Sequence, residues 1–328
     1  IRRQRQMCIR DRDYPRELYD IIVISDQMQE STNEALRQLP VRLLIADYTD
    51  SSKAKAMSLA MNATADIPYD AVVIMDADNT AGTSFLSELN PVFQSGARAV
   101  QAHRTAKNTN TDIAVLDAAS EEINNSIFRS GHIALGLSSA LIGSGMALEA
   151  CWFRQHIHLL ETAGEDKEME ALLLKQRIHI EYLEHVYVKD EKTQKKEGIK
   201  NQRKRWIAAQ FDSLVRALPD FPKELLRGNI DYCDKVFQWT LLPRIILIFC
   251  TFFFTILVTL VSPYSSIKWW ILAFALFLAL FTAIPGHLLN KQLLRAIFQL
   301  PSLLLGIASN LFKLKGVNKK FIHTAHGN

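Results

Sequence analysis

Two long apolar stretches near the C-terminus constrain this chain more than any other feature. Ile245–Val261 holds 17 residues without a charge, and Trp269–Ile284 is also uncharged. Each approaches the roughly 20 apolar residues that span about 30 Å of bilayer hydrocarbon. Ser262–Ser266 between them predicts a turn, so we expect a transmembrane helical hairpin over residues 238–290. Two helices of a soluble core are the alternative.

Charges around this hairpin set its expected orientation. The turn carries Lys268 alone, whereas the outer ends carry six basic residues: Lys223, Arg227, Lys235, Arg244, Lys291 and Arg295. Basic residues stay on the cytosolic side of membranes. Tyr264, Trp269 and Trp270 suit an interfacial aromatic belt. The sequence therefore predicts a multi-pass protein of the cell membrane with its N-terminal domain in the cytosol.

Basic clusters flank the apolar region, at Lys192–Arg205 and Lys313–Lys320. They suggest attraction to an anionic lipid bilayer, with a solvated face as the alternative. Leu293–Phe312 is apolar but interrupted, which predicts an interfacial helix followed by a basic cytosolic tail within residues 291–328, with a third membrane span as the alternative. The net charge of +4, with no basic stripe interleaved with aromatics, excludes a nucleic-acid-binding surface.

The four cysteines and the first residues carry little information about the fold. The cysteines form no C-x-x-C pair, which favours reduced thiols over a disulfide framework or a zinc site. Ile1–Arg12 is a basic run without the apolar core of a signal peptide. We expect residues 1–12 to be non-native or disordered.

Short apolar runs alternate with helical patterns over residues 13–190. The strongest strand candidate is Ala71–Met75, with others at Ile21–Ile24, Val41–Ala46 and Ala97–Ala102, and Lys53–Ala65 predicts a helix. Continuous apolar runs are typical of strands covered on both faces. We therefore predict an α/β domain with a mainly parallel sheet, followed by amphipathic interface helices over residues 191–237.

Asp76 and Asp78 directly follow the Ala71–Met75 strand. Carboxylates at the carboxyl end of a buried strand point into the crevice where α/β sheets bind ligands. Their hard oxygens suit Mg²⁺ or Mn²⁺, bound together with substrate phosphates. Asp11-Arg12-Asp13 has the same spacing without such a context, and a strand-end cap is the alternative for the second pair.

Five further residues or segments have two interpretations each. Asp26 ends a strand and could cap a helix, while Lys53 could meet a phosphate or lie on the surface. Gly143–Met146 allows close approach of backbone to a ligand, or an ordinary turn. Gly164–Glu168 is a charged helix start or holds a general base. Gln202–Trp206 suits a diphosphate and a sugar ring, or a basic membrane-surface helix.

In this order, the segments resemble those of glycosyltransferase family 2, notably its processive branch with cellulose, chitin and hyaluronan synthases. The resemblance covers about residues 14–210. It is carried by V-I-S-D at Val23, K-A-K-A-M at Lys53, V-I-M-D-A-D at Val73, G-S-G-M at Gly143, G-E-D at Gly164 and Q-R-K-R-W at Gln202. Q-x-x-R-W downstream of an acidic pair and of D-x-D is specific as an ordered set.

This resemblance implies a GT-A fold and an inverting transfer from a UDP-type donor. Asp166 would be the base that deprotonates the acceptor hydroxyl, and Asp78 would hold the metal. Contacts to the nucleotide sugar would come from Asp26, Lys53, Asp76, Asp78 and Gly145. Gln202, Arg205 and Trp206 would line the diphosphate and the acceptor end.

The resemblance further implies polysaccharide synthesis on a glycan or lipid-linked acceptor. The sequence departs from the family's pattern in three ways. The family's opening strand before Pro15 is absent, and Ser52 and Ser58 replace the usual Gly and Asn. Processive members also have more membrane helices than the two expected here. These departures suggest an N-terminally truncated fragment, a homo-oligomer, a membrane partner subunit, or single-sugar transfer to a lipid or short acceptor. A catalytically silent membrane subunit is a further alternative.

Overall fold

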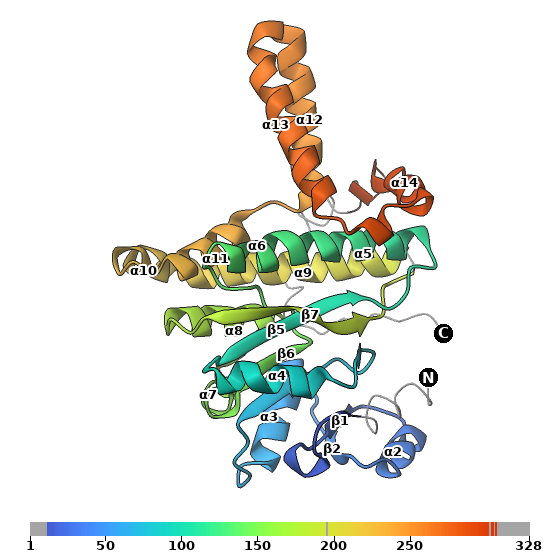
Figure 1. Ribbon diagram of the computed structural model, residues 1–328, viewed down its shortest axis with the longest axis vertical. Coiled ribbons are helices and arrows are strands. Elements are labelled where there is room, and N and C mark those ends of the chain that lie inside the picture. Colours follow the sequence, from blue (N-terminus) through green and yellow to red (C-terminus); the bar gives the residue numbers. More distant parts are fainter. Residues whose placement is uncertain (1–11, 195, 302, 305, 307–328) are drawn as a thin grey trace.

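The computed structural model describes residues 12–194, 196–301, 303, 304 and 306. An α/β body carries a layer of long helices, and a helical hairpin projects from that layer (Figure 1). The predicted non-native segment at residues 1–12 and the basic tail at Lys313–Lys320 lie outside the described residues, except Arg12.

Seven strands form two sheets in the described part of the chain. Their bounds are β1 Ile22–Asp26, β2 Arg42–Ala46, β3 Ala71–Ile74, β4 Thr80–Ala81, β5 Ala99–Ala106, β6 Met146–Glu149 and β7 Ile180–Asp190. β1 and β2 pair in parallel as a two-stranded sheet. The five-stranded sheet has the order β3-β6-β5-β7-β4. All four predicted strands exist, and β4, β6 and β7 are additional.

The prediction of a mainly parallel sheet is wrong. Within the larger sheet only β5 and β7 run parallel, while the pairs β3–β6, β5–β6 and β4–β7 are antiparallel. The sheet is therefore mixed. The physical reason is that continuous apolar runs reflect coverage on both faces of a strand, and that coverage is present here without parallel pairing.

Two apolar clusters cover the two faces of the larger sheet. Met146, Leu148 and Ile180 are fully buried in the first, against the helices α7 (Ala150–His156), α8 (Glu165–Lys175) and α11 (Ile230–Thr240). Val100, Ala147 and Val188 are buried in the second, against α4 (Phe85–Gln94). Neighbouring residues of one strand thus enter opposite clusters, as the two-residue period of a strand requires.

The helices of the body and of the layer above it have the following bounds: α2 Glu30–Arg37, α3 Lys53–Ala63, α4 Phe85–Gln94, α5 Asp112–Asn125, α6 Gly131–Ala134, α7 Ala150–His156, α8 Glu165–Lys175, α9 Lys196–Ala217, α10 Phe221–Leu226 and α11 Ile230–Thr240. The predicted helix at Lys53–Ala65 is confirmed as α3. Ser52 caps it, because its side chain accepts a hydrogen bond from Lys55 N. α5 and α9 lie side by side between the sheet and the hairpin (Figure 1).

The hairpin consists of α12 Arg244–Val261 and α13 Pro263–Thr282. Both are long and apolar enough to cross a membrane, and 11% of each span is buried. The predicted turn at Ser262–Ser266 is shorter than expected, because Pro263 already opens α13, a position where its missing N–H costs nothing. Small residues pack between the helices, with Thr255 and Ala273 almost completely buried.

The predicted interfacial helix at Leu293–Phe312 is described only in part. α14 spans Lys291–Ile297 and packs along α5. Asn290 caps it through a hydrogen bond from Leu293 N at 3.0 Å. Leu293 packs in a buried cluster with Val115 and Ala118 of α5, and Ala296 is also buried.

Candidate active site

A single large cavity of about 1560 Å³ runs from the carboxyl end of β3, past α5 and α9, to the base of the hairpin. Seven of the nine residues predicted to form the site line it: Lys53, Asp76, Asp78, Asp166, Gln202, Arg205 and Trp206. These residues come from α3, the loop after β3, α8 and α9. The fold therefore brings together segments that are more than a hundred residues apart in the sequence.

Lys53 joins three sides of the cavity. Its Nζ lies 2.5 Å from Asp76 Oδ1, 2.6 Å from the carbonyl oxygen of Gly143 and 3.7 Å from Glu165 Oε1. Burial would lower the pKa of Lys53, but Asp76 and Glu165 outweigh it and raise the pKa. Gly143 has φ +77°, which favours glycine, and this turn aims its carbonyl at the ammonium group.

Asp78 lies beside a second carboxylate that the sequence did not indicate. With its amide oriented to suit both acids, Asn79 Nδ2 lies 2.9 Å from Asp78 Oδ1 and 3.2 Å from Asp190 Oδ1. Its oxygen then accepts from Ser144 Oγ at 2.7 Å. The loop after β3 is thus tied to the end of β7 and to the Gly143–Gly145 turn.

The acidic start of α8 faces the same space. Gly164 precedes it, and a Cβ there would lie 2.8 Å from Ala209 Cβ, so only glycine lets α8 and α9 approach this closely. Asp166 lines the cavity and is half-buried, while Glu165 is buried. Burial, and then the charge of Asp166, raise the pKa of Glu165 to about 7 against the opposing effect of Lys53.

Three side chains of the Gln202–Trp206 segment reach the cavity from α9. Gln202 Oε1 is buried and has no hydrogen-bond partner within the described residues. Burial lowers the pKa of Arg205, and Glu165 partly offsets this. Trp206 is 36% exposed, with the Arg203 guanidinium 5.1 Å from its ring centre. An unpaired acceptor, a cation and an indole face together are able to bind a polar, anionic ligand.

The two remaining predicted residues do not line the cavity. Asp26 ends β1 and accepts a hydrogen bond from Ser51, which does line it, while Asp26 Oδ1 is buried without a partner among the described residues. Gly145 is buried behind the turn, where a Cβ would lie 3.0 Å from Val188 Cγ2 of β7. Its φ of +65° is a second reason for glycine at this position.

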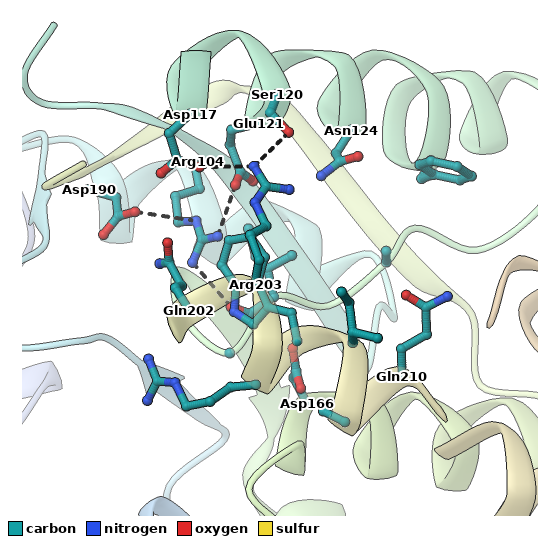
Figure 2. Close-up of a pocket in the computed structure, with 18 of the residues that line it drawn as sticks. Arg104, Asp117, Ser120, Glu121, Asn124, Asp166, Asp190, Gln202, Arg203 and Gln210 are labelled. Carbon is teal, nitrogen blue, oxygen red and sulfur yellow. Dashed lines mark hydrogen bonds and ion pairs between the residues drawn. The ribbon is translucent and has the colours of Figure 1, made fainter. Parts of the chain in front are cut away.

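Sequence reasoning missed a buried ionic network beside the site. Arg104 of β5 donates to Glu121 of α5 at 3.0 Å, and Lys192 Nζ lies 2.9 Å from Asp190. Arg129 Nη1 lies 3.2 Å from Glu121. Burial would raise the pKa of Glu121, but the three cations hold it well below its usual range. Figure 2 shows Arg104 between Asp190 and Glu121 at the edge of the cavity.

The described residues contain no group of three or more His, Cys, Asp or Glu side chains arranged to hold a metal ion. The cysteines they include, Cys151, Cys233 and Cys250, are free thiols. A metal at Asp78 would therefore depend on ligands from a bound substrate, as phosphate oxygens supply in many Mg²⁺ sites.

Comparisons with known proteins give the following findings. The model of the family described as "Glycosyl transferase family group 2" matches residues 71–282. No curated protein matches the chain. A solved structure titled "Crystal Structure of a Mycobacterial Protein" aligns with a TM-score of 0.42 and 13% identity over 59% of this chain, which spans 64% of that structure's length. The matched family range contains Asp76 to Trp206 and both hairpin helices, and begins after Asp26 and Lys53.

Proposed function

Because this chain belongs to glycosyl transferase family group 2, we propose that it transfers a sugar from a UDP-type donor to an acceptor hydroxyl, with inversion at the anomeric carbon. One observation carries the proposal: Asp76, Asp78 and Asp166 line a single cavity although they come from distant segments. A donor held at the carboxyl end of β3 would lie across the cavity from the carboxylate at the start of α8.

Asp166 is the proposed general base. Inverting transfer needs a carboxylate opposite the leaving group, placed to take the proton of the acceptor hydroxyl. Asp166 is half-buried in the cavity wall, and its Oδ1 accepts a hydrogen bond from Lys167 N at 2.9 Å. This bond orients the carboxylate and leaves the other oxygen for a substrate. Glu165 is the weaker candidate, because it is buried beside Lys53.

Mg²⁺ or Mn²⁺ is the proposed cofactor, and the donor atoms present fit it. Asp78 offers a hard carboxylate oxygen, and Asp190 brings a second carboxylate to the same amide of Asn79. Asp78 would hold the cation. When bound, such a cation stabilises negative charge on a departing diphosphate. Lys53 would support the same diphosphate from α3, since its ammonium is held at the cavity wall by Asp76.

The segment from Gln202 to Trp206 is proposed to bind the diphosphate and the acceptor. Arg205 would donate to phosphate oxygens, for which a guanidinium fork is well shaped. Gln202 Oε1 would accept from a sugar hydroxyl, which would satisfy an acceptor that is otherwise buried and unpaired among the described residues. The Trp206 face would lie against a sugar ring.

We further propose that the hairpin spans a membrane, with the α/β body in the cytosol, and that the product is a polysaccharide. The exposed apolar surface of both helices supports the membrane assignment, because a soluble core would bury it. Single-sugar transfer to a lipid or short acceptor is the second candidate, favoured because the described residues contain two candidate membrane helices. Donor labelling followed by product sizing separates the two, since single additions would exclude processive synthesis.

The experiment that tests the function is a panel of UDP-sugars assayed for UDP release on membranes that contain the chain. We expect release with one sugar, in the presence of Mg²⁺ or Mn²⁺ and not after chelation. Asp78→Ala should lose metal-dependent donor binding, whereas Asp66→Asn, at an exposed position, should retain it. Equal UDP affinity of Asp78→Ala with and without Mn²⁺ would contradict the metal assignment.

A further inference from the structure

The cavity has two chemically different parts. Its lower part carries the carboxylates and cations described above, whereas its wall beside the hairpin consists of aliphatic side chains. These are Ile245 and Ile248 of α12, Leu276 and Leu280 of α13, Leu293 of α14 and Leu300. A sugar polymer in contact with this wall would lose hydrogen bonds to water without replacing them, which costs free energy for each hydroxyl. A hydrocarbon chain contacts this wall without that cost.

Arg244 lies where the two parts meet. It is the first residue of α12 and lines the cavity. Its guanidinium donates to the carbonyl oxygen of Ser120 at 3.3 Å and to Asn124 Oδ1. Both acceptors are neutral, and no carboxylate of the described residues lies within ion-pair distance of Arg244. A guanidinium at the edge of an apolar space without an anionic partner is able to bind an anion from a ligand.

A second guanidinium converges on the same helix. Arg203 Nη2 lies 3.0 Å from Ser120 Oγ and 3.1 Å from Asp117 Oδ1, so Ser120 accepts from both arginines. One carboxylate and two guanidinium groups leave a net positive charge at this point. Figure 2 shows Asp117, Ser120 and Asn124 of α5 on one side of Arg203, with Asp166 on the other. Both arginines line the same cavity as Asp166 and the aliphatic wall.

From this arrangement we infer that the acceptor is a saccharide joined through phosphate to a hydrocarbon chain. This inference rests on the proposed function. The hydrocarbon would lie against the aliphatic wall, the phosphate at Arg244, and the saccharide hydroxyl near Asp166. In the transfer, the hydroxyl oxygen bonds to the anomeric carbon of the donor while the bond from that carbon to the diphosphate breaks. The hydroxyl proton passes to Asp166 and UDP leaves.

Binding of simple probes to the full chain in detergent tests the inference. We expect farnesyl phosphate to raise the Tm more than farnesol or inorganic phosphate at the same concentration. Arg244→Gln should lower the affinity for farnesyl phosphate by on the order of tenfold, the loss of a charge-assisted hydrogen bond, and leave the affinity for farnesol unchanged. Arg295→Gln, at an exposed site outside the cavity, is the matched control. Ile248→Trp, which fills the aliphatic part, should weaken both farnesyl probes and spare inorganic phosphate.

Several results would overturn the inference. They are an unchanged affinity in Arg244→Gln, equal binding of inorganic phosphate, and equal competition by a diacyl phosphatidic acid, which would indicate bulk membrane lipid. If farnesyl phosphate does not raise the Tm, the inference is wrong, and the aliphatic wall would instead contact protein, such as the hairpin of a second copy. UDP release with a water-soluble saccharide acceptor but no farnesyl phosphate binding would refute this inference alone. Arg244-dependent binding without UDP release from any donor would refute the proposed function instead.

Discussion

The α/β body and the hairpin differ in how far their apolar side chains are exposed. In the body, Leu148, Leu173 and Ile180 have no exposed surface, and water exclusion stabilises the fold. In the hairpin, Leu260 is 79% exposed and Phe274 is 65% exposed. The body therefore encloses an apolar core, whereas the hairpin leaves most of its apolar side chains exposed. The cavity lies across the boundary between them, with most of its charged side chains in the body and its aliphatic side chains in the hairpin, α14 and Leu300.

The largest expected effect tests whether the general base is a side chain of the α/β body. Asp166→Asn should lower kcat by about 10²–10⁴, as expected for loss of a general base. Donor affinity and Tm should change little, because within the described residues the side chain accepts a single backbone hydrogen bond. Steady-state UDP release and UDP titration on the same membranes measure both. Asp66→Asn is the control, and near-normal turnover in Asp166→Asn would remove this residue from the proposed role.

The next effect tests how far the body depends on its buried charges. Glu121→Gln leaves Arg104, Arg129 and Lys192 with one carboxylate fewer in a buried site. Breaking a buried ion pair costs about 3–5 kcal/mol, so a clear fall in Tm is expected. Glu34→Gln, at an exposed position of α2, should leave Tm unchanged. Equal Tm values for the two variants would show that the network contributes little.

A third substitution sharpens the contrast on the hairpin side. A charge near the centre of a membrane span costs about 2.5–3.5 kcal/mol, but the same change on a wet surface costs almost nothing. Phe274→Asp in α13 should therefore reduce the fraction of protein recovered in membranes after carbonate washing. Leu18→Asp, which is 62% exposed in the native body, is the matched control. Equal membrane recovery of both variants would argue against a spanning hairpin.

The sequence predicted the strands of the body better than their directions. Apolar runs such as Ala71–Met75 identified buried strands, but the same pattern arises in parallel and antiparallel sheets covered on both faces. β7 was missed because Glu181, Glu184 and His185 interrupt its apolar residues. Ordered motifs indicated seven cavity residues. Asp76 and Asp78 follow the end of β3, Lys53 and Asp166 lie in the first turn of a helix, and the motif at Gln202 lies within α9.

The buried charges could not be predicted in this way. From the local sequence alone, Arg104 and Glu121 are charged residues that would be expected on the surface. Only the packing of β5 against α5 brings them together. Arg244 carried a signal for membrane orientation, and its place in the cavity depends on the contact between α12 and α5. Long-range pairing of this kind leaves no local pattern in a single sequence.

The smallest expected effect concerns Glu165, which lies in the body at the edge of the cavity. Its pKa is raised from 4.5 to about 7, so the folded protein holds this proton more tightly than the unfolded chain does. Folding therefore takes up a proton between these values, and stability should fall as the pH rises from about 4.5 to about 7. Glu165→Gln cannot titrate and should flatten this slope in Tm measured across that range, whereas Glu34→Gln should keep it. A slope in Tm that persists in Glu165→Gln would show that other titratable groups cause the pH dependence.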